Sequence, residues 1–120
     1  MRHPADPERE RSPDIYQTLD GLEVTLDPAT WSQHIRVRHE EVTKDELRQA
    51  LITPNRICAH TSNPHRRIYE GLPRRSGFFK DSFLLVVVAL TGERSGRVLT
   101  AYLDRRHYRG QQLWPPQTNT

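Results

Sequence analysis

The stretch Asp81-Ser-Phe-Leu-Leu-Val-Val-Val-Ala-Leu90 decides which fold we expect for this chain. Its apolar run is continuous from Phe83 to Leu90 and rich in β-branched side chains, so it predicts a strand buried on both faces and therefore central in a sheet. The segment after it, 91–96, carries two glycines and predicts a hairpin loop. Residues 97–103 then predict the neighbouring strand.

Upstream of this strand, two shorter segments predict a further hairpin. Residues 55–59 and 66–70 both alternate apolar and polar side chains, and Thr61-Ser-Asn-Pro64 between them is typical of a turn. Nearer the N-terminus, residues 22–26 also alternate, which predicts a short half-buried strand.

Two helices are expected between residues 27 and 54. The first spans about 31–39, with Thr30 available as its cap. The second begins at Thr43-Lys-Asp-Glu46, a capping-box pattern, and ends before Pro54. The resulting order, β-α-α-β-β-β-β, predicts an α+β fold in which the two helices cover one side of an antiparallel meander.

The chain has 120 residues, of which 34% are hydrophobic, so we expect one domain with a thin core. We place that domain at residues 20–114, between a disordered tail over 1–19 and a flexible tail over 115–120. No apolar stretch approaches a membrane span or a secretion signal, which predicts a cytoplasmic protein without a membrane partner. The single cysteine, Cys58, is expected to be a buried small hydrophobe rather than a nucleophile.

Charge is distributed unevenly along the chain. The whole sequence carries a formal net charge of +3, yet residues 1–55 are net acidic and the basic excess lies entirely in residues 56–120. A basic half suggests a polyanionic partner such as a nucleic acid, although an arginine-rich solvated surface would give the same totals.

One face of the first helix carries two histidines. At helical spacing, His34 and His39 share a face with Arg38 and with the apolar anchors Trp31 and Ile35. Their i,i+5 spacing does not favour metal chelation, so we expect no metal site and no cofactor. Histidine is suited to proton transfer near neutral pH, but two histidines at a helix end could also simply pack or cap.

Two pairs of strand residues are also candidates. Arg67 and Tyr69 share one face of their strand, beside Arg66, which suits phosphate and base contacts or merely keeps an edge strand soluble. Thr100 and Tyr102 share a face just before the basic segment 104–109 and could bind phosphate, or could simply be strand formers.

Taken together, these motifs resemble the phage-associated barnase–EndoU–colicin–RelE-like nuclease domains over residues 20–114. Many relatives have proline where this chain has Glu40, and lysine is scarce, so an arginine would have to supply the cation. The motifs that carry the resemblance are Trp31-x-x-His34-Ile35, Arg38-His39-Glu40, Pro54-x-x-Ile57, Arg67-x-Tyr69 and Thr100-Ala101-Tyr102.

The resemblance implies two N-terminal helices packed on a four-stranded antiparallel sheet, and a metal-independent endoribonuclease of a kind often deployed as a toxin or effector. His34 would be one proton-transfer group, and His39 or Tyr69 the other, while Arg67 neutralises the phosphate. RNA would be the substrate, with an antitoxin or immunity protein as a further partner. The residues expected to bind the nucleotide are Thr100, Tyr102, Arg66, Arg105 and Arg106.

A different class of function stays open on the same residues. Arginine and tyrosine side chains can hold phosphates and stack on bases without turnover, so the chain could be a non-catalytic RNA-binding module. It could also be a protein-interaction module of a phage or toxin–antitoxin system, with its basic half meeting an acidic partner.

Overall fold

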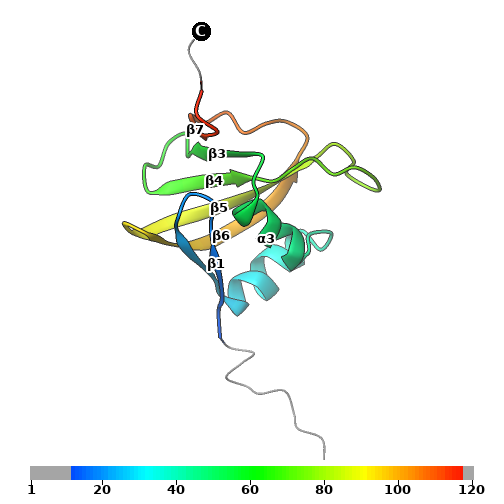
Figure 1. Cartoon of the computed structure of the whole chain (residues 1–120). Helices are drawn as coiled ribbons and strands as arrows, with labels where there is room; N and C mark the ends of the chain where they lie inside the picture. The colour runs from blue at the N-terminus through cyan, green and yellow to red at the C-terminus, as the bar shows by residue number, and fades with distance from the viewer. Residues whose placement is uncertain (1–11, 118–120) are drawn as a thin grey trace, which may run out of the picture.

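Strands dominate the computed structural model, which describes residues 12–117 (Figure 1). Helical residues lie only between β2 and β3 within this range, as a π-helical turn η1 (Thr30–Ile35), a short α2 (Arg36–Arg38) and α3 (Lys44–Ile52). The strands are β1 (Asp14–Gln17), β2 (Glu23–Leu26), β3 (Arg56–Ala59), β4 (Arg66–Glu70), β5 (Phe83–Gly92), β6 (Ser95–Asp104) and β7 (Gln112–Trp114).

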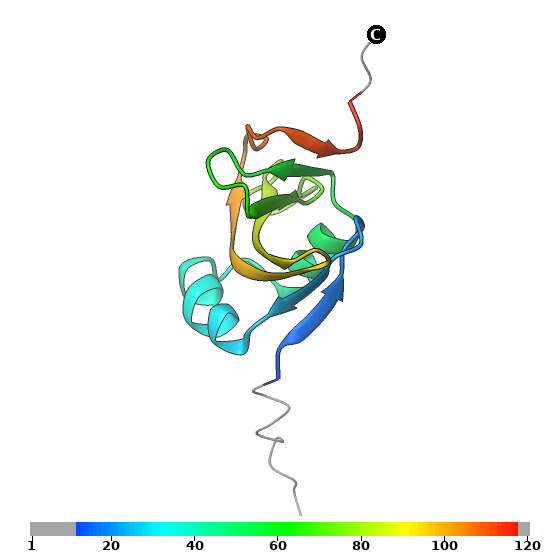
Figure 2. The same ribbon diagram turned by 90° about the vertical axis from the view of Figure 1, so that its left-hand side faces the viewer.

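All of these strands join one seven-stranded sheet of order β1-β2-β6-β5-β4-β3-β7. Neighbours run antiparallel except β2 and β6, which run parallel. The predicted α+β fold, with two N-terminal helices packed on a four-stranded antiparallel sheet, is therefore wrong: the fold is mostly sheet, and the sheet is larger and mixed. Figure 2 shows the sheet curling between its distant edge strands, β1 and β7.

The prediction of the fold class failed because it missed strands at the edges of the sheet. The β-segments expected at 22–26, 55–59, 66–70, 81–90 and 97–103 all form, but β1 lies inside the expected tail 1–19. Four residues of alternation among prolines and charges give little signal, and the pairing partner of β1 lies across the turn at Gly21, whose φ is +89°. Residues 1–11 and 118–120, parts of the two expected tails, lie outside the described residues.

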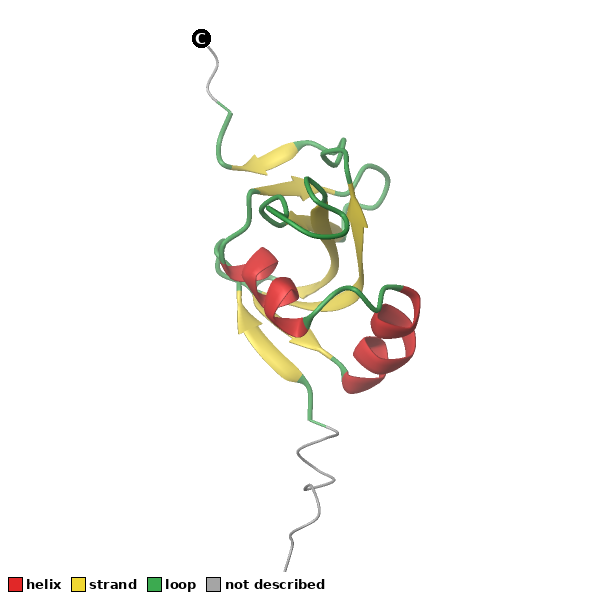
Figure 3. Ribbon diagram, turned by 90° about the vertical axis from the view of Figure 1, so that its right-hand side faces the viewer, coloured by secondary structure: helices red, strands yellow, loops and turns green. Residues whose placement is uncertain are grey.

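The helix at 44–52 forms where the capping box predicts it. Thr43 Oγ1 accepts a hydrogen bond from the Glu46 backbone N–H at 3.1 Å, and Leu47, Ala50 and Leu51 are buried against the sheet. The first helical segment, η1 with α2, buries only Ile35 and packs against β6. Figure 3 shows both helical segments away from β7. None of the helices among residues 12–117 is long and apolar enough to cross a membrane.

The sheet separates two apolar clusters. The larger one lies on the α3 side and includes Tyr69, while the smaller one lies on the other side, where Tyr102 and Tyr108 pack against it. Successive strand residues point to opposite faces, so Tyr69 and its neighbour Glu70 extend to different sides of β4. We call the side of the smaller cluster the second face; its buried members are Cys58, Ile68, Phe83, Leu85 and Val87.

Candidate functional site

A fully buried carboxylate lies at the end of β4. Glu70 is 0% exposed, and its oxygens accept hydrogen bonds from Asn55 Nδ2 at 3.0 Å and from the Tyr108 backbone N–H at 3.1 Å. Arg56 Nη1 lies 3.7 Å from Oε1, and His107 Nδ1 lies 2.9 Å from Oε2. Donors therefore surround the buried charge, as the cost of removing a carboxylate from water requires.

His107 is the only one of these partners that is classed as exposed, whereas Asn55, Arg56 and Tyr108 are partly buried. Its side chain is 54% exposed, and its ring lies on Phe83 with 4.4 Å between centroids. An ionised carboxylate can only accept hydrogen bonds, so a hydrogen bond between such a carboxylate and the His107 ring requires the proton to be on Nδ1. In the neutral ring, Nε2 is then the nitrogen with a lone pair, which is the arrangement that a general base requires.

The loop between β6 and β7, residues 105–111, holds His107 in place. The Ala59 backbone N–H donates to Gln111 O at 2.8 Å, and the Thr61 backbone N–H donates to Tyr108 Oη at 3.1 Å. The loop backbone comes so close to β3 that a Cβ on Gly110 would lie 2.0 Å from Ala59 O. Glycine is needed at this position because any side chain would displace the loop.

A cavity of about 290 Å³ opens beside His107 on the second face. Two arginines, Arg106 and Arg109, and one carboxylate, Asp104, contribute the formal charges of its wall, so cations are in excess. Tyr102 also lines it, and burial, followed by the proximity of Tyr108 and Asp104, raises the pKa of the Tyr102 phenol. The cavity thus combines an oriented histidine, guanidinium groups and a neutral phenol.

A second histidine lies near Tyr102. The His39 ring is 6.5 Å from the Tyr102 ring between centroids, and His39 Nδ1 lies 3.8 Å from Glu41 Oε1. His39 follows α2, which continues the η1 turn that packs against β6. Tyr102 is therefore shared between the His107 cavity and His39.

Three further predicted residues belong to this region. Arg66 pairs with Ala89 and Thr100 pairs with Val87, so both share the second face with Glu70. Arg105 is exposed in the β6–β7 loop next to Arg106. His34 is half-buried in η1, and no interaction places it beside Tyr102 among the described residues.

Two predicted catalytic residues lie on the opposite side of the sheet. Tyr69 is 0% exposed, and its hydroxyl donates to Asp20 Oδ1 at 2.7 Å. Arg67 Nη1 lies 2.7 Å from the other oxygen of Asp20, and Thr18 Oγ1 donates to Asp20 Oδ1 at 2.6 Å. This Asp20 latch ties the β1–β2 turn to β4, and it does not bring Tyr69 or Arg67 near His39. We therefore leave both residues out of the proposed site.

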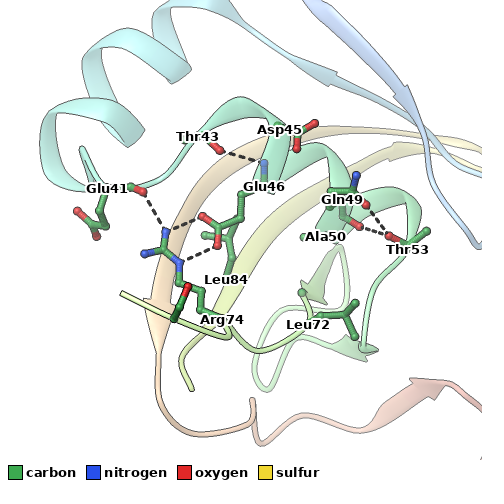
Figure 4. Close-up of a pocket in the computed structure, with 12 residues that line it drawn as sticks. Glu41, Thr43, Asp45, Glu46, Gln49, Ala50, Thr53, Leu72, Arg74 and Leu84 are labelled. Carbon is green, nitrogen blue, oxygen red and sulfur yellow. Dashed lines mark hydrogen bonds and ion pairs between the residues drawn. The ribbon is translucent and has the colours of Figure 1, made fainter. Parts of the chain in front are cut away.

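A larger cavity, about 550 Å³, lies beside α3 and is lined by Glu41, Glu46, Leu72 and Arg74 among others (Figure 4). Arg74 Nη2 is 2.6 Å from Glu46 Oε1 and donates to Glu41 O at 2.9 Å, so the strongest charges there neutralise one another. This cavity holds no histidine or cysteine, whereas the smaller one holds an oriented imidazole. Size alone therefore does not identify the functional cavity.

Sequence reasoning missed Glu70, His107 and Tyr108. The hairpin of residues 55–59 and 66–70 was predicted without a register, and the structure pairs Arg56 with Glu70 as a charge pair across its strands. His107 was visible only as a histidine within the basic segment 104–109. Among residues 12–117, no group of three or more histidine, cysteine, aspartate or glutamate side chains is placed to hold a metal ion.

Comparisons of the chain with protein-family models, with curated proteins and with solved structures found no match.

Proposed function

We propose that this protein is a metal-independent endoribonuclease whose reactive group is His107, oriented by Glu70. The observation that carries the proposal is the 2.9 Å contact between His107 Nδ1 and the fully buried carboxylate of Glu70. The His107 side chain is itself 54% exposed, and it lines a cavity together with Arg106 and Arg109. A nucleophile or base held by a second group that is itself fixed is the usual arrangement of an acid–base site.

The chemistry follows from the groups in reach. A base removes the proton from the ribose 2′-hydroxyl, whose oxygen attacks the adjacent phosphorus while the bond to the 5′-oxygen breaks. An acid returns a proton to that 5′-oxygen, so the products are a 2′,3′-cyclic phosphate and a 5′-hydroxyl. We assign these two proton transfers to His107, which lines the cavity with Tyr102, and to His39, whose ring is 6.5 Å from the Tyr102 ring.

Arginines would stabilise the charge that builds on the phosphate. Arg106 and Arg109 line the cavity, and a guanidinium can bind two phosphate oxygens at once. Fixed cations at the developing charge lower the barrier because they need no reorganisation during the reaction. Tyr102 would position the nucleotide, and Arg105 and Arg66 would contact phosphates further along the strand.

The test is incubation of single-stranded RNA with the purified chain in excess EDTA, comparing the wild type with His107→Ala. His65→Ala is the matched control, because His65 is an exposed histidine outside the cavity. We expect cleavage in EDTA with cyclic-phosphate ends, unchanged in His65→Ala and reduced roughly 10²–10⁴-fold in His107→Ala. Cleavage that disappears in EDTA, or that persists in His107→Ala, contradicts the assignment.

Binding without cleavage would instead support a non-catalytic RNA-binding module. In that case RNA stays intact after long incubation, and the dissociation constant depends steeply on salt. The toxin role and its inhibitor protein remain predictions from the family resemblance.

A further inference from the structure

We propose that the loop between β4 and β5 is a stacking site for an unpaired base of the RNA strand, with Phe78 as the platform. This inference rests on the proposed function, because it names how the same substrate is held beyond the His107 cavity. We call residues 72–82 the aromatic loop. Figure 1 shows it projecting from the body of the sheet.

Phe78 is the most exposed large apolar side chain among the described residues, at 91%. The neighbouring side chains Arg75 and Lys80 are exposed as well, so a ring and two cations project together. Side chains of these types bind single-stranded nucleic acids, because a ring stacks on any base while cations follow the phosphates.

Hydrogen bonds and an ion pair fix the conformation of the aromatic loop. Its base is closed by hydrogen bonds from Arg74 N to Ser82 O at 3.0 Å and from Asp81 N to Arg74 O at 2.9 Å. Arg74 also ties the loop to α3 through Glu46, at 2.6 Å and 2.8 Å. Phe79 lies 5.9 Å from the Arg74 guanidinium, so one ring anchors the loop and its neighbour, Phe78, is left to project.

Backbone geometry at the tip agrees with this interpretation. Phe79 has a φ of +63° and Asp81 a φ of +69°, in the left-handed region that bulky side chains rarely adopt. Such conformations persist where the surroundings enforce them, and they concentrate at functional sites. A loop fixed in this way presents Phe78 at a small cost in conformational entropy on binding.

The aromatic loop leads directly into the proposed active site. It ends at Ser82, and the next residue, Phe83, supports the His107 ring at 4.4 Å. The five residue-to-residue steps from Phe78 to Phe83 can span at most about 18 Å, which a few nucleotides of an extended strand can bridge. A base on Phe78 and a scissile phosphate at His107 could therefore belong to one RNA strand, and this proximity favours RNA over a lipid surface or a protein as the occupant.

The experiment measures binding of a fluorescent single-stranded oligoribonucleotide to the full chain carrying His107→Ala, which separates binding from cleavage. Adding Phe78→Ala should weaken binding roughly 5- to 150-fold, and Phe78→Trp should restore it. Leu113→Ala, which truncates an exposed apolar side chain on β7, is the matched control and should leave binding unchanged. Replacing Arg75 and Lys80 by alanine should lower the salt dependence of log Kd by about 0.7 for each lost phosphate contact.

In the cleaving chain, Phe78→Ala should raise KM with little change in kcat, because the ring acts away from the reacting atoms. RNA binding and KM that are the same in Phe78→Ala and Leu113→Ala overturn the proposal, even if cleavage by the wild type upholds the proposed function. Conversely, Phe78-dependent binding without cleavage keeps this site and contradicts the ribonuclease. Loss of binding to phosphatidylserine vesicles in Phe78→Ala, with RNA binding intact, would show a lipid contact and overturn it as well.

Discussion

Tyr69 and Glu70 are neighbours on β4, and both are 0% exposed, yet their side chains lie on opposite sides of the sheet. The Tyr69 hydroxyl donates a hydrogen bond to Asp20, which also contacts Thr18 and Arg67. These contacts join the β1–β2 turn to β4. Glu70 instead holds an imidazole that faces solvent beside a cavity. Both residues are therefore buried polar groups with partly exposed partners, but only Glu70 contacts a histidine that lines a cavity.

The largest effect on stability is expected at Glu70. Replacement by alanine removes the charge beside Arg56, whose side chain is 20% exposed, and takes an acceptor from Asn55 and from the Tyr108 backbone. Leaving a buried donor without its acceptor costs about 1–3 kcal/mol, and two donors lose theirs, so Glu70→Ala should lower the free energy of unfolding by about 2–6 kcal/mol. Urea denaturation measures it, and a loss below about 1 kcal/mol would show that the contacts of Glu70 contribute little to folding.

A smaller, pH-dependent effect is expected at Tyr69. Tyr69→Phe removes a hydrogen bond to a carboxylate and should cost about 1–2 kcal/mol at neutral pH. Burial, and then the hydrogen bond to Asp20, raise the pKa of the Tyr69 phenol above its ordinary value of 10.0. The unfolded chain therefore loses this proton first as the pH rises.

The wild type should accordingly keep the contribution of Tyr69 below pH 10.0 and lose it above that pH, by at most about 1.4 kcal/mol per unit. Urea denaturation between neutral and alkaline pH should show a shallower decline in Tyr69→Phe, with a decline that remains because burial also raises the pKa values of Tyr16, Cys58 and Tyr102. Parallel declines in the two proteins would contradict this account of the latch.

The smallest effect is expected at Arg67. Its side chain is 24% exposed and that of Asp20 is 22% exposed, so solvent screens their ion pair. Arg67→Ala should cost about 0.2–1 kcal/mol, and the difference from wild type should shrink as salt is added. A salt-independent loss of several kcal/mol would indicate that Arg67 does more than pair with Asp20.

The central strands could be predicted because their signals are local. The run Phe83–Leu90 is buried almost throughout, and the capping box at Thr43 starts α3 as expected. The edges of the sheet could not be predicted in the same way, because β1 and β7 are short and their strand character depends on partners distant in sequence. The five strands predicted from the sequence therefore became seven in one sheet, where the family resemblance implied a sheet of four, and the fold class changed with it.

The residues of the candidate site also differ in whether a local sequence pattern could predict them. His39, Tyr102 and Arg106 were named from local patterns and lie around one cavity region. The Glu70–His107 contact joins residues 37 apart, across a loop that has no periodic pattern, so no local signal predicts it. Arg67 and Tyr69 were correctly placed on one face of their strand, but alternation does not say which side of the sheet that face will meet.

The most direct test of the account compares the two neighbours by isosteric substitution, Glu70→Gln and Tyr69→Phe, in single-turnover cleavage of RNA under saturating protein. Circular dichroism first confirms that both variants are folded. We predict that Glu70→Gln lowers the rate by roughly 10²-fold or more, because an amide does not stabilise the protonated His107 ring, while Tyr69→Phe stays within about threefold of wild type. Equal rates in the two variants would contradict the claim that Glu70 orients a catalytic histidine.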